Sequence, residues 1–239
     1  MKMPDIALPP GVTARFGENP QQVAEELADT VADALRRRLA EAAEATLVVS
    51  GGSTPRPFFA ALSRKELDWA RVIVTLADER WVDEPDPASN AGLVKSSLLR
   101  NRAAAACFLP LKQEGETPAQ GFDAVKAGLA RLRTPVDVLV LGMGSDGHTA
   151  SWFPDAPELS VAMDPACPDP VAAMTPPSQD RARITLTWPV LCNARFTALH
   201  IKGADKLVTL RTALAHPAEL SAMPVRAFLK AGLQIFWSP

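Results

Sequence analysis

The sequence predicts an α/β fold built on an open, mainly parallel sheet with helices on both faces. Helical and β-rich segments alternate along most of the 239 residues, which is the order that builds parallel sheets. The apolar run at 136–141 is typical of a strand covered on both faces. Three glycines follow within 142–148 and allow a tight turn at the carboxyl end of this strand, where open α/β sheets bind ligands.

The first half of the chain begins with a clear helical pattern. Apolar residues recur at helical spacing through 23–45, as at Val23, Leu27 and Val31, and predict an amphipathic helix. The other elements expected in this half are a strand at 46–50, a helix at 57–62 with a proline near its first turn, a strand at 71–76, a polar loop at 85–89, a helix at 90–99, a strand at 107–109 and a helix at 118–133.

Beyond the central strand the pattern is less regular. Residues 154–179 contain seven prolines and little periodicity, which predicts an irregular surface segment with at most a short turn of helix. The elements expected after it are β-rich runs at 184–187 and 196–201, a helix at 204–215 and a last strand at 231–237. No repeat or clear linker divides the chain, so we expect one domain over residues 1–239.

Composition and charge restrict the classes of function. Charged residues are 22% and hydrophobic residues 47% of the chain, as in soluble globular proteins. The formal net charge of −2 gives no reason to expect nucleic acid or a membrane surface as partner. No apolar segment approaches the roughly 20 residues of a membrane span, and residues 1–10 do not resemble a signal peptide. The three cysteines are widely spaced, so we expect no disulfide framework and no zinc site, but a reducing, cytoplasmic setting.

Residues 50–54, Ser-Gly-Gly-Ser-Thr, lie between a predicted strand and a predicted helix. Glycines let backbone N–H groups converge, hydroxyl groups add donors, and a helix N-terminus favours an anion, so this loop suits a phosphate. It lacks the lysine and the spacing of a Walker loop, so a nucleoside triphosphate is not implied. A plain glycine-rich turn with a helix cap explains these residues equally well.

Two further groups of charged residues are candidate ligand contacts. Asp78-Glu79-Arg80 directly follows a predicted strand, where Asp78 and Arg80 can face a ligand and arginine suits an oxyanion. A solvated turn with a local ion pair is the alternative. Arg183 and Lys206 can supply positive charge to a phosphate, or can be ordinary surface residues.

The loop after the central strand carries Asp146 and His148. Histidine suits a general base at neutral pH, and a carboxylate two residues away can orient its ring and stabilise the imidazolium. Alternatively, Asp146 caps a following helix and His148 is an exposed turn residue. Gly142, Gly144 and Gly147 also match the spacing of a dinucleotide fingerprint. Asp146 would place a negative charge beside the pyrophosphate, however, and no strand ending in an acid follows about 20 residues later, so we expect no dinucleotide.

Five motifs over residues 46–210 together resemble the 6-phosphogluconolactonase family. They are SGGSTP, DERWV followed by Asn90, GMGSDGHTASWFP, RITLTWPVL and KGADK, in the order and at about the separations of that family. The resemblance implies a Rossmann-like fold of the type shared with glucosamine-6-phosphate deaminases. It also implies hydrolysis of 6-phosphoglucono-δ-lactone to 6-phosphogluconate in the oxidative pentose phosphate pathway, with no cofactor and no metal.

The resemblance also implies roles for individual residues. His148 matches the general base that activates water, and Asp146 matches the carboxylate that orients it. The substrate-binding residues implied or suggested are Gly51, Gly52, Ser53 and Thr54 as a phosphate loop, Arg183 and Lys206 as its counter-charges, Arg80 and Asp78 near the substrate, and Asn90 at the sugar hydroxyls. The expected partner is a small sugar-phosphate lactone, bound by a monomer or small homo-oligomer.

Two alternative functions remain. The related deaminases resemble this chain in the SGGSTP and GxDGH segments, but continue with a pattern like DGHIAFNEP, in which a glutamate assists the histidine. Phe153 stands at the matching position here, and a phenyl ring cannot transfer a proton, which disfavours a deaminase or sugar-phosphate isomerase. A non-catalytic sugar-phosphate sensor is the second alternative, although binding alone does not need a base.

Overall fold

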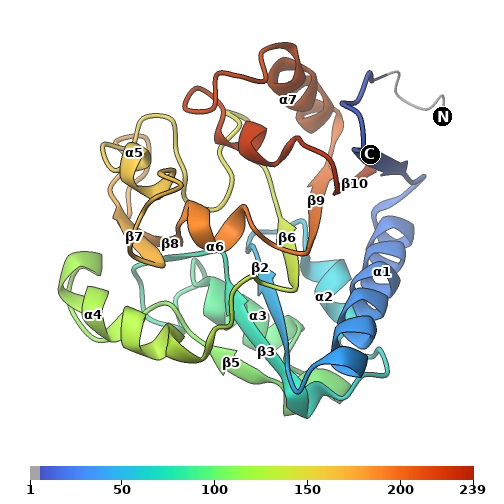
Figure 1. The fold of residues 1–239 in the computed structure, drawn as a ribbon, viewed down its shortest axis with the longest axis horizontal. Coiled ribbons are helices and arrows are strands. Elements are labelled where there is room, and N and C mark those ends of the chain that lie inside the picture. Colours follow the sequence, from blue (N-terminus) through green and yellow to red (C-terminus); the bar gives the residue numbers. More distant parts are fainter. Residues whose placement is uncertain (1–5) are drawn as a thin grey trace.

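The computed structural model describes residues 6–239, and its centre is a seven-stranded sheet whose neighbouring strands are all parallel (Figure 1). The strand order is β1-β10-β9-β6-β2-β3-β5. In sequence order these strands are β1 (Thr13–Phe16), β2 (Ala45–Val49), β3 (Val72–Leu76), β5 (Cys107–Leu109), β6 (Val138–Leu141), β9 (Phe196–Lys202) and β10 (Leu233–Ser238). The predicted mainly parallel α/β fold is confirmed.

The central strands have the largely apolar sequences that are typical of a parallel sheet. Every residue of β2, β3 and β6 is buried, as expected for strands covered by other elements on both faces. The edge strand β1 alternates exposed and half-buried residues and was not predicted. Its four residues carry little periodicity of their own, and pairing with β10 fixes them in the sheet.

A second, antiparallel sheet of three strands corrects two expectations. It has the order β4-β8-β7, with β4 (Asp78–Arg80), β7 (Val171–Met174) and β8 (Arg183–Leu186). The charged segment 78–80 was expected to be a loop, and 154–179 was expected to be irregular except for a short helical turn. The latter segment contains both β7 and a short helix, α5 (Leu159–Ala162). These short strands have weak local patterns and form because β8 supplies hydrogen-bonding partners to both of them.

The five predicted helices all form in the expected order, although most of their ends differ, and a four-residue helix at 188–191 was not predicted. The principal helices are α1 (Pro20–Glu41), α2 (Arg56–Leu62), α3 (Asn90–Ser97), α4 (Pro118–Gly128), α6 (Trp188–Leu191) and α7 (Ala204–Ala215). Helix α1 begins at Pro20, three residues before the predicted start, because Asn19 caps it by accepting a 2.9 Å hydrogen bond from the N–H of Gln22. It packs on α2 and against β2, β6 and β10 (Figure 1).

The parallel strands direct several loops to one edge of the sheet. Residues 50–55 follow β2, β4 follows β3 after Ala77, and 142–148 follow β6. Carboxyl ends of neighbouring parallel strands meet at the same edge, so segments far apart in the sequence come together there. Within residues 6–239, none of the helices has the length and apolar character needed to cross a membrane.

Candidate functional site

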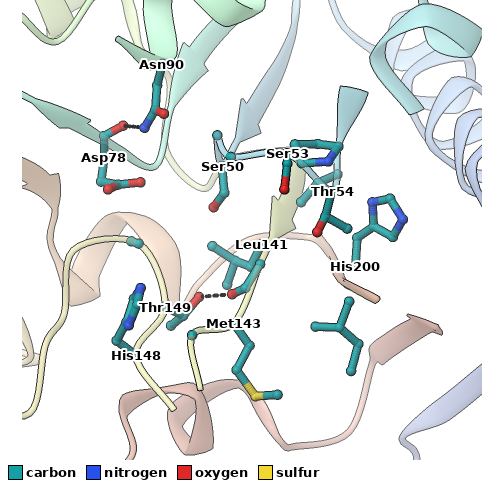
Figure 2. A pocket seen from close by; sticks show the side chains of 18 of the residues that line it. Ser50, Ser53, Thr54, Asp78, Asn90, Leu141, Met143, His148, Thr149 and His200 are labelled. Atoms are coloured by element: carbon teal, nitrogen blue, oxygen red, sulfur yellow. Dashed lines mark hydrogen bonds between the residues drawn. The ribbon is translucent and has the colours of Figure 1, made fainter. Parts of the chain in front are cut away.

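A cavity of about 290 Å³ opens at this edge of the sheet. It brings together every candidate site residue except Asp146, which is hydrogen-bonded to His148. The candidates that line it are Gly51, Gly52, Ser53, Thr54, Asp78, Arg80, Asn90, His148, Arg183 and Lys206. Figure 2 shows His148 on one side of the pocket, with Ser53 and Thr54 on another and Asp78 beside Asn90.

Asp146 and His148 form a hydrogen-bonded pair. The Nδ1 atom of His148 is 2.6 Å from Oδ1 of Asp146, and the same oxygen accepts a 3.1 Å bond from the His148 backbone N–H. Partial burial of Asp146 opposes ionisation, but its hydrogen bonds and charge interaction with His148 outweigh this and lower the pKa of the carboxyl group. Because Asp146 engages Nδ1, the Nε2 atom is the ring nitrogen left for a ligand or water.

Glycines in this loop leave room for the pair. A Cβ atom at Gly144 would lie 2.1 Å from Nδ1 of His148 and 2.5 Å from Oδ1 of Asp146. Gly147 has φ +80°, and a Cβ there would also meet the side chain of Met223 at 2.7 Å. No helix follows directly, since residues 148–153 form turns and a bridge between Thr149 and Trp152. Asp146 is therefore not a helix cap, and the spacing of the glycines lacks the helix that a dinucleotide fingerprint requires.

The 50–54 loop presents free hydrogen-bond donors. The backbone N–H groups of Gly51, Gly52 and Ser53 donate no hydrogen bond to any of the residues 6–239. Gly51 is required because a Cβ atom there would lie 1.9 Å from Oδ1 of Asn90. Gly52 has φ +97°, a conformation that side chains rarely adopt. The loop therefore offers N–H groups to an anion at the wall of the cavity.

Asp78 and Asn90 are fixed to one another and to the loop beyond His148. The Asn90 side-chain amide donates a 2.9 Å hydrogen bond to the Asp78 carbonyl, and the Ser151 hydroxyl donates a 2.6 Å bond to Oδ2 of Asp78. Arg80 is held by a 2.5 Å bond from Nη1 to the carbonyl of Ala88. Asp78 and Asn90 are almost completely buried, so their side chains are preorganised before any ligand arrives.

Two basic residues complete the cavity wall. Arg183 is 7% exposed, and its Nη2 donates a 2.6 Å hydrogen bond to Oε1 of Gln179. Burial lowers the pKa of Arg183 and the charge of Arg80 lowers it further, against the opposing charge of Asp78. Lys206 donates a 2.8 Å hydrogen bond to the Ser145 hydroxyl, in the same loop as His148. The reading of these two residues as ordinary surface does not fit their position in the cavity wall.

Sequence reasoning missed Glu79 as a structural support of the site. This fully buried carboxylate accepts hydrogen bonds from the backbone N–H groups of Arg80, Asn90 and Ala91, at 2.8, 2.8 and 2.7 Å. Burial raises the pKa of Glu79, and these three hydrogen bonds oppose the rise. The carboxylate thereby fixes the start of α3 and the backbone of Asn90. The available signal was the pair of acids, Asp78 and Glu79, directly after the largely apolar segment 72–77.

Lys202 and His200, on β9, also line the cavity and were not predicted. A basic residue at the end of the predicted strand 196–201 was the signal for Lys202. His200 is 5% exposed, its ring contacts Phe58 edge-on at 6.2 Å between centroids, and its Nδ1 has no partner among the described residues.

We expect His200 to make the fold sensitive to acid. Burial lowers the pKa of His200 from 6.5 to about 4. Between these pH values the unfolded chain binds a proton that folded His200 does not, so the free energy of unfolding falls as the pH falls from 6.5 towards 4. The full difference is about 3 kcal/mol. Urea unfolding at pH 7 and pH 4 should show a smaller decrease for His200→Leu than for the wild type, whereas the exposed His216→Leu control should match the wild type. Equal decreases in all three proteins would contradict this.

Within residues 6–239 no group of three or more histidine, cysteine, aspartate or glutamate side chains is arranged to hold a metal ion. The three cysteines are free.

Comparison with known proteins gives a consistent result. The family model described as glucosamine-6-phosphate isomerases/6-phosphogluconolactonase matches residues 18–237. A 6-phosphogluconolactonase of Pseudomonas aeruginosa is 47% identical over 100% of both chains, and one of Rhizobium meliloti is 46% identical over 93% of this chain and 97% of its own. The crystal structure of a 6-phosphogluconolactonase from Shewanella baltica has a TM-score of 0.93 and 39% identity, covering 98% of this chain and 100% of that one. A monomeric glucosamine-6-phosphate deaminase shares the fold, with a TM-score of 0.75, 14% identity, and 95% and 97% coverage of the two chains.

Proposed function

Because this chain belongs to the glucosamine-6-phosphate isomerase/6-phosphogluconolactonase family, we propose that it hydrolyses 6-phosphoglucono-δ-lactone to 6-phosphogluconate, in the oxidative pentose phosphate pathway. The observation that carries the proposal is that His148, hydrogen-bonded to Asp146, lines the same cavity as the free N–H groups of the 50–54 loop. One cavity thus holds a base for the chemistry and donors for a phosphate.

The 6-phosphate binds the 50–54 loop, with Arg183 and Lys206 as counter-charges. The unpaired N–H groups of the loop suit phosphate oxygens, and a buried guanidinium forms charge-assisted hydrogen bonds with them. Asp78 and Asn90, which are buried and fixed to one another beside the loop, accept and donate hydrogen bonds to the sugar hydroxyls. These contacts place the lactone carbonyl near His148.

His148 acts first as a base and then as an acid. Its neutral Nε2 takes a proton from a water molecule as the water oxygen attacks C1, and Asp146 stabilises the resulting imidazolium. Arg80 or a loop N–H stabilises the tetrahedral oxyanion. When the intermediate collapses, the bond from C1 to the ring oxygen breaks, and that oxygen takes the proton from His148. The net reaction adds one water molecule to the lactone and returns His148 to its initial protonation state.

Phe153 supports hydrolysis over deamination. The deaminase pattern places a glutamate at this position to assist its histidine in ring opening. In this chain the residue next to His148 is a buried phenyl ring with a centroid separation of 4.0 Å, which neither accepts nor donates a proton.

Arg183→Ala is expected to act mainly on substrate affinity. Loss of a charge-assisted contact with the phosphate should raise KM by about 10- to 100-fold and change kcat much less. Steady-state kinetics of the variant would test this, with Arg181→Ala as the control, because Arg181 is an exposed arginine two residues away whose ion pair with Asp86 spans 3.8 Å. A loss of kcat at constant KM would remove Arg183 from the phosphate site.

The function itself is tested by measuring acid release from freshly generated 6-phosphoglucono-δ-lactone above the spontaneous rate, beside the same lactone without its phosphate. We expect acceleration of the phosphorylated lactone alone. Equal acceleration of both lactones would support hydrolase activity but contradict phosphate binding by the 50–54 loop. Without acceleration of either, ammonia release from glucosamine 6-phosphate would identify a deaminase, and ligand-dependent stabilisation without turnover would identify a sensor.

We further propose a single domain over residues 1–239, a cytoplasmic setting, and a monomer or small homo-oligomer. One hydrophobic core shared by the described elements supports the first, and three free cysteines support the second. Light scattering on the purified chain would test the third.

A further inference from the structure

The ring of Phe153 lies behind two residues of the cavity wall. Its centroid is 4.0 Å from that of the His148 ring, with 29° between the two planes. The Cζ atom of Arg183 is 4.9 Å from the same phenyl centroid. Phe153 is only 1% exposed and does not itself line the cavity. It therefore contacts both polar residues without offering a surface to the substrate.

Few polar contacts hold these two side chains in place. Within residues 6–239 the ring of His148 makes one hydrogen bond, to a carboxylate that is 46% exposed. Arg183 makes one, to Gln179, and its Nε has no partner among the described residues. A single hydrogen bond fixes one atom but leaves the plane of the group free to rotate. A stacked ring restrains that plane, and the negative face of the ring attracts a guanidinium or imidazolium.

The backbone around Phe153 is itself firmly anchored. Trp152 is fully buried, and its indole N–H donates a 3.0 Å hydrogen bond to the carbonyl of Leu186 in β8. The Ser151 hydroxyl donates to Asp78, and the Phe153 N–H bonds to the Ser151 carbonyl at 3.1 Å. The segment that carries the ring of Phe153 is thus anchored to both β4 and β8.

We propose that Phe153 is a positioning residue that holds His148 and Arg183 against one aromatic ring. It acts on turnover through the orientation of the base and on substrate affinity through the orientation of the guanidinium. The inference rests on the lactonase function and on the roles proposed above for these two residues. The position that lacks the deaminase glutamate therefore has a function of its own.

The test is Phe153→Leu, which keeps an apolar side chain but removes the ring. We expect kcat to fall and KM to rise, each by about 3- to 10-fold, in line with the strength of aromatic stacking and cation–π contacts. The effect on KM should disappear when Arg183 is already alanine, and the effect on kcat should disappear when His148 is already alanine. Multiplicative effects in both double variants would mean that Phe153 acts only through general packing, and would overturn the proposal.

Phe236→Leu is the matched control. Phe236 is fully buried in β10, where the Cζ atom of Arg15 lies 6.0 Å from its ring. The control variant therefore also loses a buried ring that contacts an arginine, but neither Phe236 nor Arg15 lines the cavity. We expect a lower melting temperature with kcat and KM unchanged. The same kinetic losses in this control as in Phe153→Leu would contradict a specific role for Phe153.

Fluorinated phenylalanines at position 153 keep the test decisive if the leucine variant does not fold. Successive fluorine atoms weaken the negative face of the ring while nearly preserving its shape. We expect KM for the lactone, and the dissociation constant of 6-phosphogluconate measured by calorimetry, to rise stepwise with fluorination. Constant values across the series would overturn the role at Arg183. Failure of the wild type to hydrolyse the lactone would instead reject the proposed function, while the calorimetric series would still report on the contact with Arg183.

Discussion

Replacing His148 by alanine is expected to lower kcat for 6-phosphoglucono-δ-lactone by about 10²- to 10⁴-fold, the usual contribution of general acid–base catalysis. The variant removes the only group that we propose to accept the proton of the attacking water. The 50–54 loop, Arg183 and Lys206 are untouched, so KM should change little. Initial-rate measurements over a range of lactone concentrations, corrected for spontaneous hydrolysis, would separate the two constants.

Two controls make this result specific to the base. His216→Ala changes an exposed histidine just beyond α7 and should retain wild-type kinetics. Added imidazole should partly restore turnover to His148→Ala, because the alanine leaves space beside Asp146 and the missing group is a proton acceptor. Near-normal turnover in His148→Ala would remove this histidine from the mechanism, whatever the controls show.

Gly144→Ala is expected to lower kcat by about 10²-fold, although it leaves both Asp146 and His148 in place. The new methyl group would lie 2.1 Å from Nδ1 and 2.2 Å from Cε1 of His148, closer than real Cβ contacts. The imidazole is the end of a side chain and can move away, which separates it from the carboxylate and from the lactone. A displacement of about 1 Å at a reacting group can cost about 10²-fold in rate.

Gly142→Ala is the matched variant for this experiment. It lies in the same loop, and a Cβ atom there meets no protein atom within 4 Å, so its kcat should fall much less. Thermal unfolding of both variants would show whether the fold is retained. If the folded Gly144→Ala protein kept wild-type kcat, the close approach of this glycine to the pair would have no catalytic importance.

The elements predicted best from the sequence are those with strong local patterns. Helix α7 was predicted with its observed ends, 204–215, and strand β5 with its observed ends, 107–109. The long helix α1 was predicted through its periodicity, although the cap at Asn19 starts it earlier and it ends at Glu41. A hydrophobic period of 3.6 residues or an unbroken apolar run is a property of the local sequence, so it predicts an element without knowledge of the element's neighbours.

Two strands missed from the sequence are short and depend on pairing with a third strand. Strand β4 is three residues long and pairs with β8 across about 100 positions of the chain. Strand β7 is four residues long and pairs with β8 across about 10 positions. Neither has a hydrophobic alternation that would mark it as a strand. Their hydrogen bonds come from a neighbour whose position is decided only when the whole sheet assembles.

The parallel sheet, the loops at its carboxyl edge and the candidate groups of the cavity could all be predicted from the amino-acid sequence, because strand runs, glycines and polar residues are local features of the chain. The way in which those groups support one another depends on the folded chain. Glu79 fixes the start of α3, Ser151 holds Asp78 from 73 positions away, and Phe153 contacts both His148 and Arg183. Such contacts join segments that no local period relates, since they arise from packing the carboxyl ends of several strands around one cavity.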